Sequence, residues 1–322
     1  MPASQAFPRR GLIFAATLAI IAFCGGLYGC LAMRGTSIEP FQNTNGITVP
    51  GKGITIFAAG DIAECKNIKP ENSGAAKTAD MIAAGLDRDK RAAVLGLGDY
   101  AYPVGLLEEF ADCYEPAWGR FRNRTFPAPG NHEYYTPSAT GYYTYFGPAA
   151  GPDRRGYYSF NLGAWHLVSL NSNLQPADHQ QQILWLQADL ARHPAHCTLA
   201  FWHHPLYSSG GHGNNDRVKD LWQALSAAGA DVVLVAHDHD YERFAPQDNT
   251  GRRDDIHGMR EFVVGTGGAR LTPLMFGKAN SEVKNNSTHG VLRMVLKDTG
   301  YEWEFMPVPG GNFTDRGAAL CH

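Results

Sequence analysis

The chain has 322 residues, of which 44% are hydrophobic and 18% charged, so it is long enough for one large domain or two small ones with a full core. Its formal net charge of −3 and its lack of a long basic run argue against nucleic acid as an obligate partner, because binding to a phosphate backbone needs clustered lysine and arginine. The sequence contains no internal repeat or low-complexity stretch, which argues against a repeat architecture.

Residues 1–33 are predicted to be a targeting segment. Arg9 and Arg10 precede an uncharged, apolar stretch over residues 11–33, which is long enough to span a bilayer as a helix. A cleaved signal peptide and a retained membrane anchor both fit this pattern. Lipidation is a third interpretation, because Leu27–Cys30 resembles a bacterial lipobox. All three export the rest of the chain to the periplasm or the extracellular space, with membrane contact only through this segment.

Residues 34–52 are predicted to be a linker, because they contain glycine, proline and threonine and lack hydrophobic periodicity. The catalytic domain is expected to cover residues 53–322. In this part of the chain, short apolar runs alternate with segments of helical periodicity.

Five apolar runs are each followed by side chains that can bind a metal. The runs are predicted to be buried strands and cover residues 54–60, 92–98, 125–130, 198–202 and 230–236. The side chains that follow them are Asp61, Asp99, Asn131 with His132, His203 with His204, and His237 with Asp238 and His239. Because ligands bind beyond the carboxyl ends of strands in open α/β sheets, one fold could bring all five groups to a single rim. Such a rim has too many ligands for one tetrahedral ion.

Helices are predicted between these strands. They cover about residues 75–86, residues 178–192 with Asp178 as the N-cap, and a segment from Asn215 or Asp216 to a stop at Gly229. Further strands are predicted at residues 155–162, 165–170, 261–265, 290–297 and 301–308. We therefore predict an α/β fold, a four-layer α/β/β/α sandwich of two packed mixed β-sheets flanked by helices.

Four cysteines follow the targeting segment, an even number that suits two disulfides in an oxidising compartment. Four cysteines allow three connectivities, and the sequence alone does not choose among them. We expect Cys65 to pair with Cys113, which would tether two loops that each follow a ligand strand. We expect Cys197 to pair with Cys321, which would hold the C-terminal tail beside the fourth ligand strand.

The predicted rim combines carboxylate, amide and imidazole donors, a set that suits Fe, Zn, Mn, Ni or Mg. A carboxylate such as Asp99 can bridge two ions about 3.5–4 Å apart. Two metal ions lower the pKa of a shared water and clamp the oxygens of a phosphoryl group, so hydrolysis of phosphate esters is the reaction that most needs this arrangement.

The motifs around these residues resemble the metallophosphoesterase (calcineurin-like) superfamily in their order and context. They are Gly60-Asp61, Gly98-Asp99-Tyr100-Ala101-Tyr102, Gly130-Asn131-His132-Glu133, His203-His204-Pro205 and His237-Asp238-His239. Within that superfamily, the Gly-Asp-x-x-Tyr pattern and the segment Ala236–Arg243 resemble the purple acid phosphatases. The chain departs from the family pattern at Ala63 and Ala236, where glycine is usual, and neither change removes a ligand.

This resemblance implies a dinuclear metal centre with ferric iron and a divalent ion, namely Fe, Zn or Mn. The iron would be held by Asp61, Tyr102 and His239, and the divalent ion by Asn131, His203 and His237. Asp99 would bridge the two ions, and a metal-bound hydroxide would attack phosphorus. The resemblance also makes His132 the general acid for the leaving alkoxide and His212 a substrate-side histidine.

We therefore predict an exported phosphatase of the acid phosphatase type, a phosphoric ester hydrolase that acts on small phosphate monoesters. A phosphodiesterase or nucleotide-cleaving enzyme is the alternative, because the same metals serve both reactions. A non-catalytic scaffold on the same fold is the third hypothesis. The sequence assigns no role to His204 and predicts no oligomeric state.

Overall fold

The computed structural model describes residues 46–322. The predicted targeting segment and residues 34–45 of the predicted linker lie outside the described residues. Residues 46–53 contain neither helix nor strand, and the first strand begins at Ile54. Within the described part of the chain, no helix is both long enough and apolar enough to cross a membrane.

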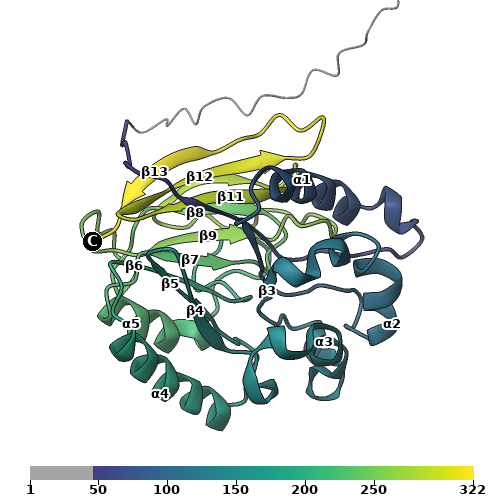
Figure 1. Cartoon of the computed structure of the whole chain (residues 1–322), viewed down its shortest axis with the longest axis horizontal. Helices are drawn as coiled ribbons and strands as arrows, with labels where there is room; N and C mark the ends of the chain where they lie inside the picture. Colours follow the sequence, from purple (N-terminus) through teal and green to yellow (C-terminus); the bar gives the residue numbers. More distant parts are fainter. Residues whose placement is uncertain (1–45) are drawn as a thin grey trace, which may run out of the picture. The chain divides into compact units, whose positions relative to one another are not determined.

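Two mixed β-sheets form the middle of the domain (Figure 1). The first sheet has the strand order β13-β12-β11-β1-β2-β3, and the second β10-β8-β9-β7-β6-β5-β4. The strands of the first sheet are β1 (Ile54–Ala59), β2 (Ala93–Gly96), β3 (Thr125–Pro127), β11 (Gly290–Lys297), β12 (Gly300–Pro307) and β13 (Arg316–Leu320). Those of the second are β4 (Tyr158–Leu162), β5 (Trp165–Ser169), β6 (Cys197–Phe201), β7 (Val232–Val235), β8 (Tyr241–Phe244), β9 (Arg260–Val264) and β10 (Ser281–Asn285). In the first sheet β1, β2 and β3 are parallel, and in the second β5, β6, β7 and β9 are parallel.

Alternate side chains of the central strands serve two different hydrophobic cores. On β6, Leu199 and Phe201 belong to the core that also contains Ile56 of β1, whereas Ala200 packs into a second core with Trp222. This two-residue period arises because successive side chains of a strand point to opposite faces of the sheet. A strand buried on both faces is apolar throughout, which is why β6 and β7 read as continuous apolar runs.

Helices cover the sheets. They are α1 (Gly74–Arg88), α2 (Leu107–Glu109), α3 (Thr140–Phe146), α4 (Pro176–Arg192) and α5 (Lys219–Ala227). Short 3₁₀ or π turns occupy Pro70–Asn72, Phe110–Tyr114, Trp118–Arg124, Glu133–Tyr135, Pro137–Ala139, Gly147–Ala150, Pro152–Arg154 and Asp216–Val218. The apolar faces of α4 and α5 pack on the second sheet, and α1 packs on the first, where Gly85 lies against the ring of Phe57. The predicted four-layer α/β/β/α sandwich is confirmed.

Several predicted boundaries differ from the structure, and two of the differences have a clear local cause. Helix α4 begins at Pro176, two residues before Asp178, because the extended Gln175 is its N-cap and proline suits the first turn, where no N–H partner is needed. Asp178 lies instead in the first turn, where its charge favours the helix dipole. Strand β4 begins at Tyr158 and not at residue 155, because Pro152–Arg154 form a 3₁₀ turn.

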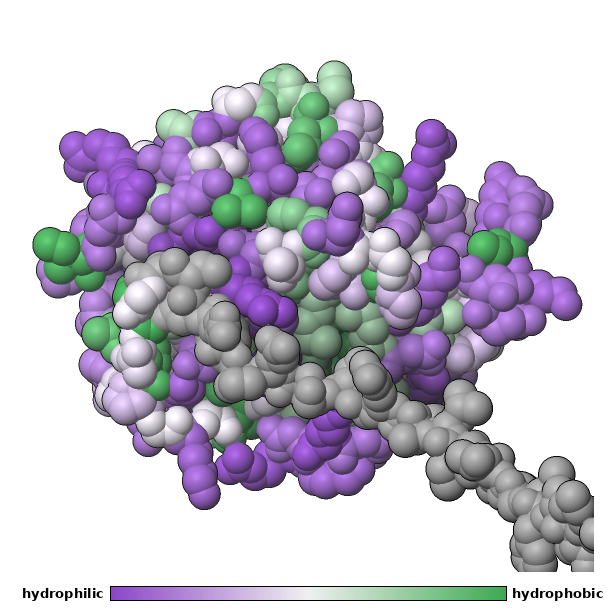
Figure 2. All heavy atoms as spheres, turned by 90° about the horizontal axis from the view of Figure 1, so that it is seen from above, coloured by the Kyte–Doolittle hydropathy of each residue, from purple (hydrophilic) through white to green (hydrophobic). Residues whose placement is uncertain are grey.

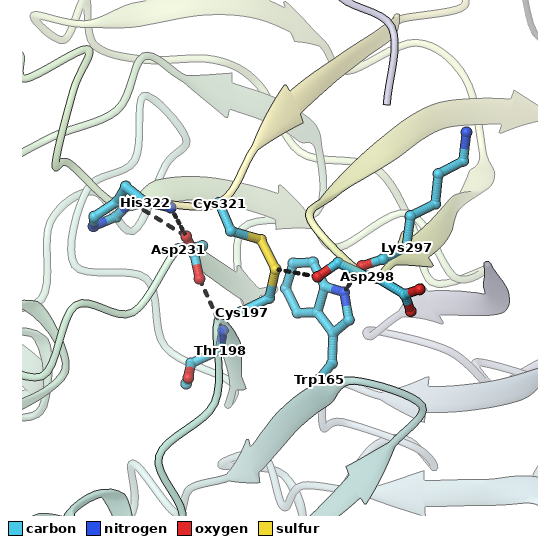
Figure 3. Close-up of a disulfide and its surroundings, with 8 residues drawn as sticks. All are labelled: Trp165, Cys197, Thr198, Asp231, Lys297, Asp298, Cys321 and His322. Carbon is cyan, nitrogen blue, oxygen red and sulfur yellow. Dashed lines mark hydrogen bonds and ion pairs between the residues drawn. A yellow bond between two sulfur atoms is a disulfide. The ribbon is translucent and has the colours of Figure 1, made fainter. Parts of the chain in front are cut away.

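Both expected disulfides, Cys65–Cys113 and Cys197–Cys321, are present, with Cα atoms 5.8 and 5.5 Å apart. The second joins β6 of one sheet to the residue that follows β13 of the other (Figure 3). Beside it, Asp231 accepts hydrogen bonds from the backbone N–H groups of Thr198 and His322, at 2.8 and 3.0 Å. The C-terminal end of the chain is therefore fixed to the second sheet by a covalent bond and a buried carboxylate.

Replacing both Cys197 and Cys321 with serine is expected to lower the free energy of unfolding by about 2–5 kcal/mol, because this bond closes a long loop in the unfolded chain. The two cysteines are 124 residues apart, against 48 for Cys65 and Cys113. Equilibrium denaturation should therefore give a larger loss for this pair than for the matched Cys65→Ser/Cys113→Ser variant. A change below about 0.5 kcal/mol would contradict the expectation.

Candidate metal centre

The five groups of polar side chains meet at one rim of the domain. Three of them follow β1, β2 and β3 of the first sheet, and two follow β6 and β7 of the second. Parallel strands end at the same edge of a sheet, so each sheet contributes its carboxyl edge to the rim.

Three of these side chains belong to residues in the left-handed backbone conformation. The φ angles are 57° at Asp61, 52° at Asp99 and 72° at His237. For residues other than glycine this conformation costs about 1 kcal/mol or more, and it persists only where the surroundings hold it. One such restraint is the bond from the His237 N–H to Asp61 Oδ2, at 2.8 Å. Strain repeated at three strand ends marks this rim as a candidate functional site.

A first set of donor atoms comes from Asp61, Tyr102 and His239. The Tyr102 Oη lies 2.9 Å from Asp61 Oδ1 and 3.1 Å from His239 Nε2. The third side of this triangle, from His239 Nε2 to Asp61 Oδ1, is 3.2 Å. The three residues are therefore close enough to share one ion, which is the grouping that the family resemblance implies.

A second set comes from Asn131, His203 and His237. The Nε2 atom of His203 lies 3.0 Å from Asn131 Oδ1 and 3.2 Å from His237 Nδ1. The family resemblance implies this set, but it does not indicate that His237 faces the other two residues with its Nδ1 atom.

A single oxygen of Asp99 lies next to both sets. Asp99 Oδ2 is 3.3 Å from Tyr102 Oη in the first set and 3.2 Å from His203 Nε2 in the second. The other oxygen, Oδ1, accepts a hydrogen bond from the His132 N–H at 2.9 Å. Asp99 is thus placed to be shared between two ions.

The hydrogen bonds behind the imidazoles fit metal binding. His203 Nδ1 lies 2.8 Å from the Leu97 carbonyl, and His239 Nδ1 lies 2.7 Å from the Arg270 carbonyl. A carbonyl can only accept, so each Nδ1 carries the proton and each Nε2 is left to bind a ligand.

The carboxylates fit as well. Asp61 and Asp99 are fully buried, and within residues 46–322 their ion pairs are with histidine and not with lysine or arginine. Buried carboxylates need compensating positive charge, which metal ions supply. The residues present therefore fit a pair of cations.

The charges of the centre are strongly linked. Burial opposes ionisation of Asp61, but His239, His203 and His237 outweigh it and hold the pKa of this carboxyl well below its usual range. Burial disfavours protonation of the imidazoles too, yet the neighbouring carboxylates raise the pKa of His203 and that of His239 to about 9. Burial and the nearby histidines lower the pKa of His237 to about 2.

Metal binding at pH 7 is expected to release at least two protons per chain, one from each of His203 and His239. The pKa values of His203 and His239 are raised to about 9, so both are protonated at pH 7 without metal, and both must lose a proton to bind it. Apparent metal affinity should therefore rise with pH up to about pH 9. Calorimetric titration of metal-free protein with Zn²⁺, in buffers of different ionisation enthalpy, measures this release. Binding without proton release would contradict the expectation.

The two residues predicted to act on the substrate both lie beside the donor sets. His132 Nδ1 is 2.6 Å from the Pro103 carbonyl, and its Nε2 is 3.8 Å from Asp99 Oδ2. The exposed ring of His212 lies 4.2 Å, between centroids, from that of His237. The backbone N–H of His212 donates to buried Asp238 at 2.8 Å, so Asp238 holds this loop in place.

Three supporting residues have no role predicted from the sequence: Glu133 and Asp238, which stand within the quoted motifs, and Ser172, which stands outside them. Buried Glu133 accepts backbone N–H bonds from Asp99, Tyr100 and Gly130 at 2.8–2.9 Å. Burial and the nearby Asp99 carboxylate raise the pKa of Glu133 to about 8. The only signal for Glu133 was its place directly after Asn131-His132.

His204, to which the sequence assigned no role, is a buried neighbour of the second donor set. Its Nδ1 lies 2.8 Å from the Ser172 hydroxyl, and its ring centroid lies 4.4 Å from that of His237. It therefore packs behind the centre with a hydrogen-bonding partner of its own.

The backbone accommodates alanine at positions 63 and 236, where the family pattern has glycine. Neither Ala63 nor Ala236 has a positive φ angle, so alanine is unstrained at both positions. The glycine that the turn needs is Gly60, because a Cβ atom there would lie 2.6 Å from the Cβ of Ala236.

The calcineurin-like phosphoesterase family model matches residues 54–241, which include all of these donors. The chain belongs to the calcineurin-like phosphoesterase family. This membership implies a dinuclear metal centre, and the donor sets described above fit one.

Relatives of this chain in sequence include purple acid phosphatases. It is 29% identical over 215 residues to purple acid phosphatase 21 of Arabidopsis thaliana, an alignment that covers 58% of this chain and 49% of the relative. It is 27% identical over 220 residues to human acid phosphatase type 7, covering 56% and 49%. The chain thus spans about half the length of the curated relatives it matches.

Solved structures show the same fold. A purple acid phosphatase, PPD1, from yellow lupin (Lupinus luteus) seeds matches with a TM-score of 0.70 and 19% identity, over 84% of this chain and 54% of that one. GAP50, described as the anchor in the inner membrane complex of Plasmodium, matches with a TM-score of 0.62 and 16% identity, over 84% and 89%. Because enzymes and an anchor share this architecture, function has to be argued from the site.

Proposed function

We propose that this protein is an exported dinuclear-metal phosphatase of the purple acid phosphatase type that hydrolyses small phosphate monoesters. The observation that carries the proposal is the position of Asp99, whose Oδ2 lies within 3.3 Å of donors in two separate sets. One oxygen shared in this way suits a pair of ions and not a single structural ion. The two disulfides support export, because such bonds persist in oxidising compartments.

In this proposal Asp61, Tyr102 and His239 hold ferric iron, and Asn131, His203 and His237 hold Fe²⁺, Zn²⁺ or Mn²⁺. A metal pair would activate a water molecule as the nucleophile and neutralise the charge of the phosphoryl oxygens. The iron assignment rests on Tyr102, a phenol buried among carboxylates. Burial and the nearby Asp61 and Asp99 raise its pKa well above the ordinary value. A phenolate there thus needs a strongly charged cation as its partner.

His132 is proposed to donate the proton that the leaving group needs. Its Nδ1–H donates a hydrogen bond to the Pro103 carbonyl. This bond orients the ring so that Nε2 faces the centre, 3.8 Å from Asp99 Oδ2. When His132 is protonated, the Nε2–H can be given to the oxygen of the departing alcohol. His212, on the exposed loop held by Asp238, is proposed to contact the phosphate oxygens.

Metal analysis and hydrolysis of 4-nitrophenyl phosphate by the purified protein test the proposal. We expect two metal ions per chain and a preference for this monoester over bis(4-nitrophenyl) phosphate. If the protein binds no metal and gains no activity when metal is added, the proposed phosphatase function is wrong. A strong preference for the diester would instead support the phosphodiesterase alternative.

A Tyr102→Phe variant tests the identity of the first ion. With iron bound, the parent protein should show a visible tyrosinate-to-iron absorption band, and the variant should lose it while still binding metal through Asp61 and His239. Iron-loaded parent protein without such a band would show that Tyr102 is not a ligand.

A further inference from the structure

A cavity of about 550 Å³ opens next to the candidate metal centre, where Tyr102 and Pro103 form part of its wall. The carbonyl of Pro103 is the group that holds His132 Nδ1, at 2.6 Å, and the rings of His132 and Tyr102 are 4.3 Å apart between centroids. The cavity therefore adjoins Tyr102 and Pro103, the two residues that contact the ring of His132, the proposed proton donor.

Apolar groups form much of the cavity wall. They are the Cys65–Cys113 disulfide, the prolines at 70 and 103, and Ile68, whose side chain is 43% exposed although it is apolar. A cavity of a few hundred cubic ångströms with such walls suits a small organic group such as a substituted benzene ring. The disulfide fixes this wall, because it ties the loop after β1 to the loop after β2.

The remaining lining is predominantly acidic: three carboxylates, Glu108, Glu109 and Asp112, against one amine, Lys66. Glu109 is turned toward the backbone, where its Oε2 accepts the N–H groups of Val104 and Leu106 at 3.1 and 2.9 Å. Glu108 and Asp112 are exposed, and no residue within 46–322 forms an ion pair or hydrogen bond with either side chain. Their charge therefore acts on whatever enters the cavity.

We infer that this cavity is the leaving-group subsite and that it selects phosphate monoesters whose leaving group has an apolar body and no negative charge, with a cationic end preferred. The inference rests on the proposed function. A second phosphate or a carboxylate on the leaving group would face two unpaired carboxylates, so nucleotides and other polyanionic esters should be poor substrates. An ammonium group would be attracted by the same charges.

Three aryl phosphates that share a two-carbon para tail and differ in the group at its end test this inference. They are 4-ethylphenyl phosphate, tyramine O-phosphate with an ammonium end, and 3-(4-phosphonooxyphenyl)propionate with a carboxylate end. In low-salt buffer we expect kcat/KM for the cationic ester to exceed that for the anionic ester by about tenfold, with the neutral ester between them. In a Glu108→Gln/Asp112→Asn variant this ratio should fall to about threefold or less.

A matched control is Asp87→Asn/Asp298→Asn, which removes the same charge from two exposed positions. Asp87 lies near the end of α1. Asp298 lies in the turn between β11 and β12, next to Leu296, which pairs with Ile54 at the start of β1. The metal donors follow the other end of β1, so Asp298 is away from the rim. This variant should keep the tenfold ratio of the parent.

Two results would contradict the proposed leaving-group subsite without contradicting the proposed phosphatase activity. One is an anionic ester hydrolysed as fast as the cationic one, and the other is a charge preference that survives the Glu108→Gln/Asp112→Asn change. Failure of the metal-loaded protein to hydrolyse any of the three esters would overturn the proposed function itself, and the subsite with it.

Discussion

An Asp99→Asn variant is expected to lose about a thousandfold or more of its phosphatase activity, because removing a shared anionic ligand forfeits several kcal/mol of charge stabilisation at the metal pair. Asparagine keeps the size of the side chain and the oxygen that accepts the His132 N–H, but it replaces the charge that both donor sets face. Metal analysis should find fewer than two ions per chain. Activity with 4-nitrophenyl phosphate gives the second measurement.

Asp189→Asn is the matched control for this variant. Asp189 is also a buried carboxylate paired with an imidazole, since its Oδ2 lies 2.9 Å from His166 Nε2, but it belongs to α4, away from the donor sets. Asp189→Asn should therefore lower stability and leave the metal content at two. If Asp99→Asn kept both ions and more than about a tenth of the activity, the bridging role would be wrong.

A His132→Ala variant is expected to keep both metal ions and to lose about 10²–10⁴-fold in kcat on alkyl phosphates, which is the usual contribution of a general acid. The loss should be much smaller with 4-nitrophenyl phosphate, because 4-nitrophenolate leaves without needing a proton. The ratio of the two losses separates proton donation from a general disturbance of the site.

His179→Ala is the control for the loss of an imidazole. His179 is bonded to Asp220 at 2.8 Å, on helices α4 and α5, and has no contact with the donor sets. It should change neither rate. Equal losses on both substrates in His132→Ala, or a loss of metal, would assign His132 to positioning and not to proton transfer.

The strands that position the site could be predicted because their signal is local. Each is a short apolar run that ends at a glycine or a polar residue, and five such runs are present as β1, β2, β3, β6 and β7. Four of them are one to three residues shorter than predicted and β6 is shifted by one residue, partly because the chain turns into the left-handed conformation at residues such as Asp61 and Asp99. Unlike a glycine, an aspartate in the sequence does not by itself predict a positive φ angle.

Three strands, β8, β10 and β13, could not be predicted, because the signal that makes them strands lies in their partners. β10 has the sequence Ser-Glu-Val-Lys-Asn, which has no apolar face, and it is a strand because it pairs with β8 at the edge of the second sheet. β13 is a short edge strand of the first sheet, and it is held in place by pairing with β12 and by the disulfide at Cys321, which follows it. Figure 2, which views the domain from above Figure 1, shows a mostly hydrophilic face with apolar side chains in small groups.

By itself, the sequence determined the donor types, their order along the chain and the strands they follow, because alternation and strand ends are properties of neighbouring residues. Only the tertiary structure decided which atoms meet. The donor sets combine residues from two sheets, so the place of Asp99 Oδ2 between them, the use of Nδ1 by His237 and the support from Glu133 all depend on how the sheets pack. The same holds for the disulfides, where three pairings were open until the fold brought Cys197 beside Cys321.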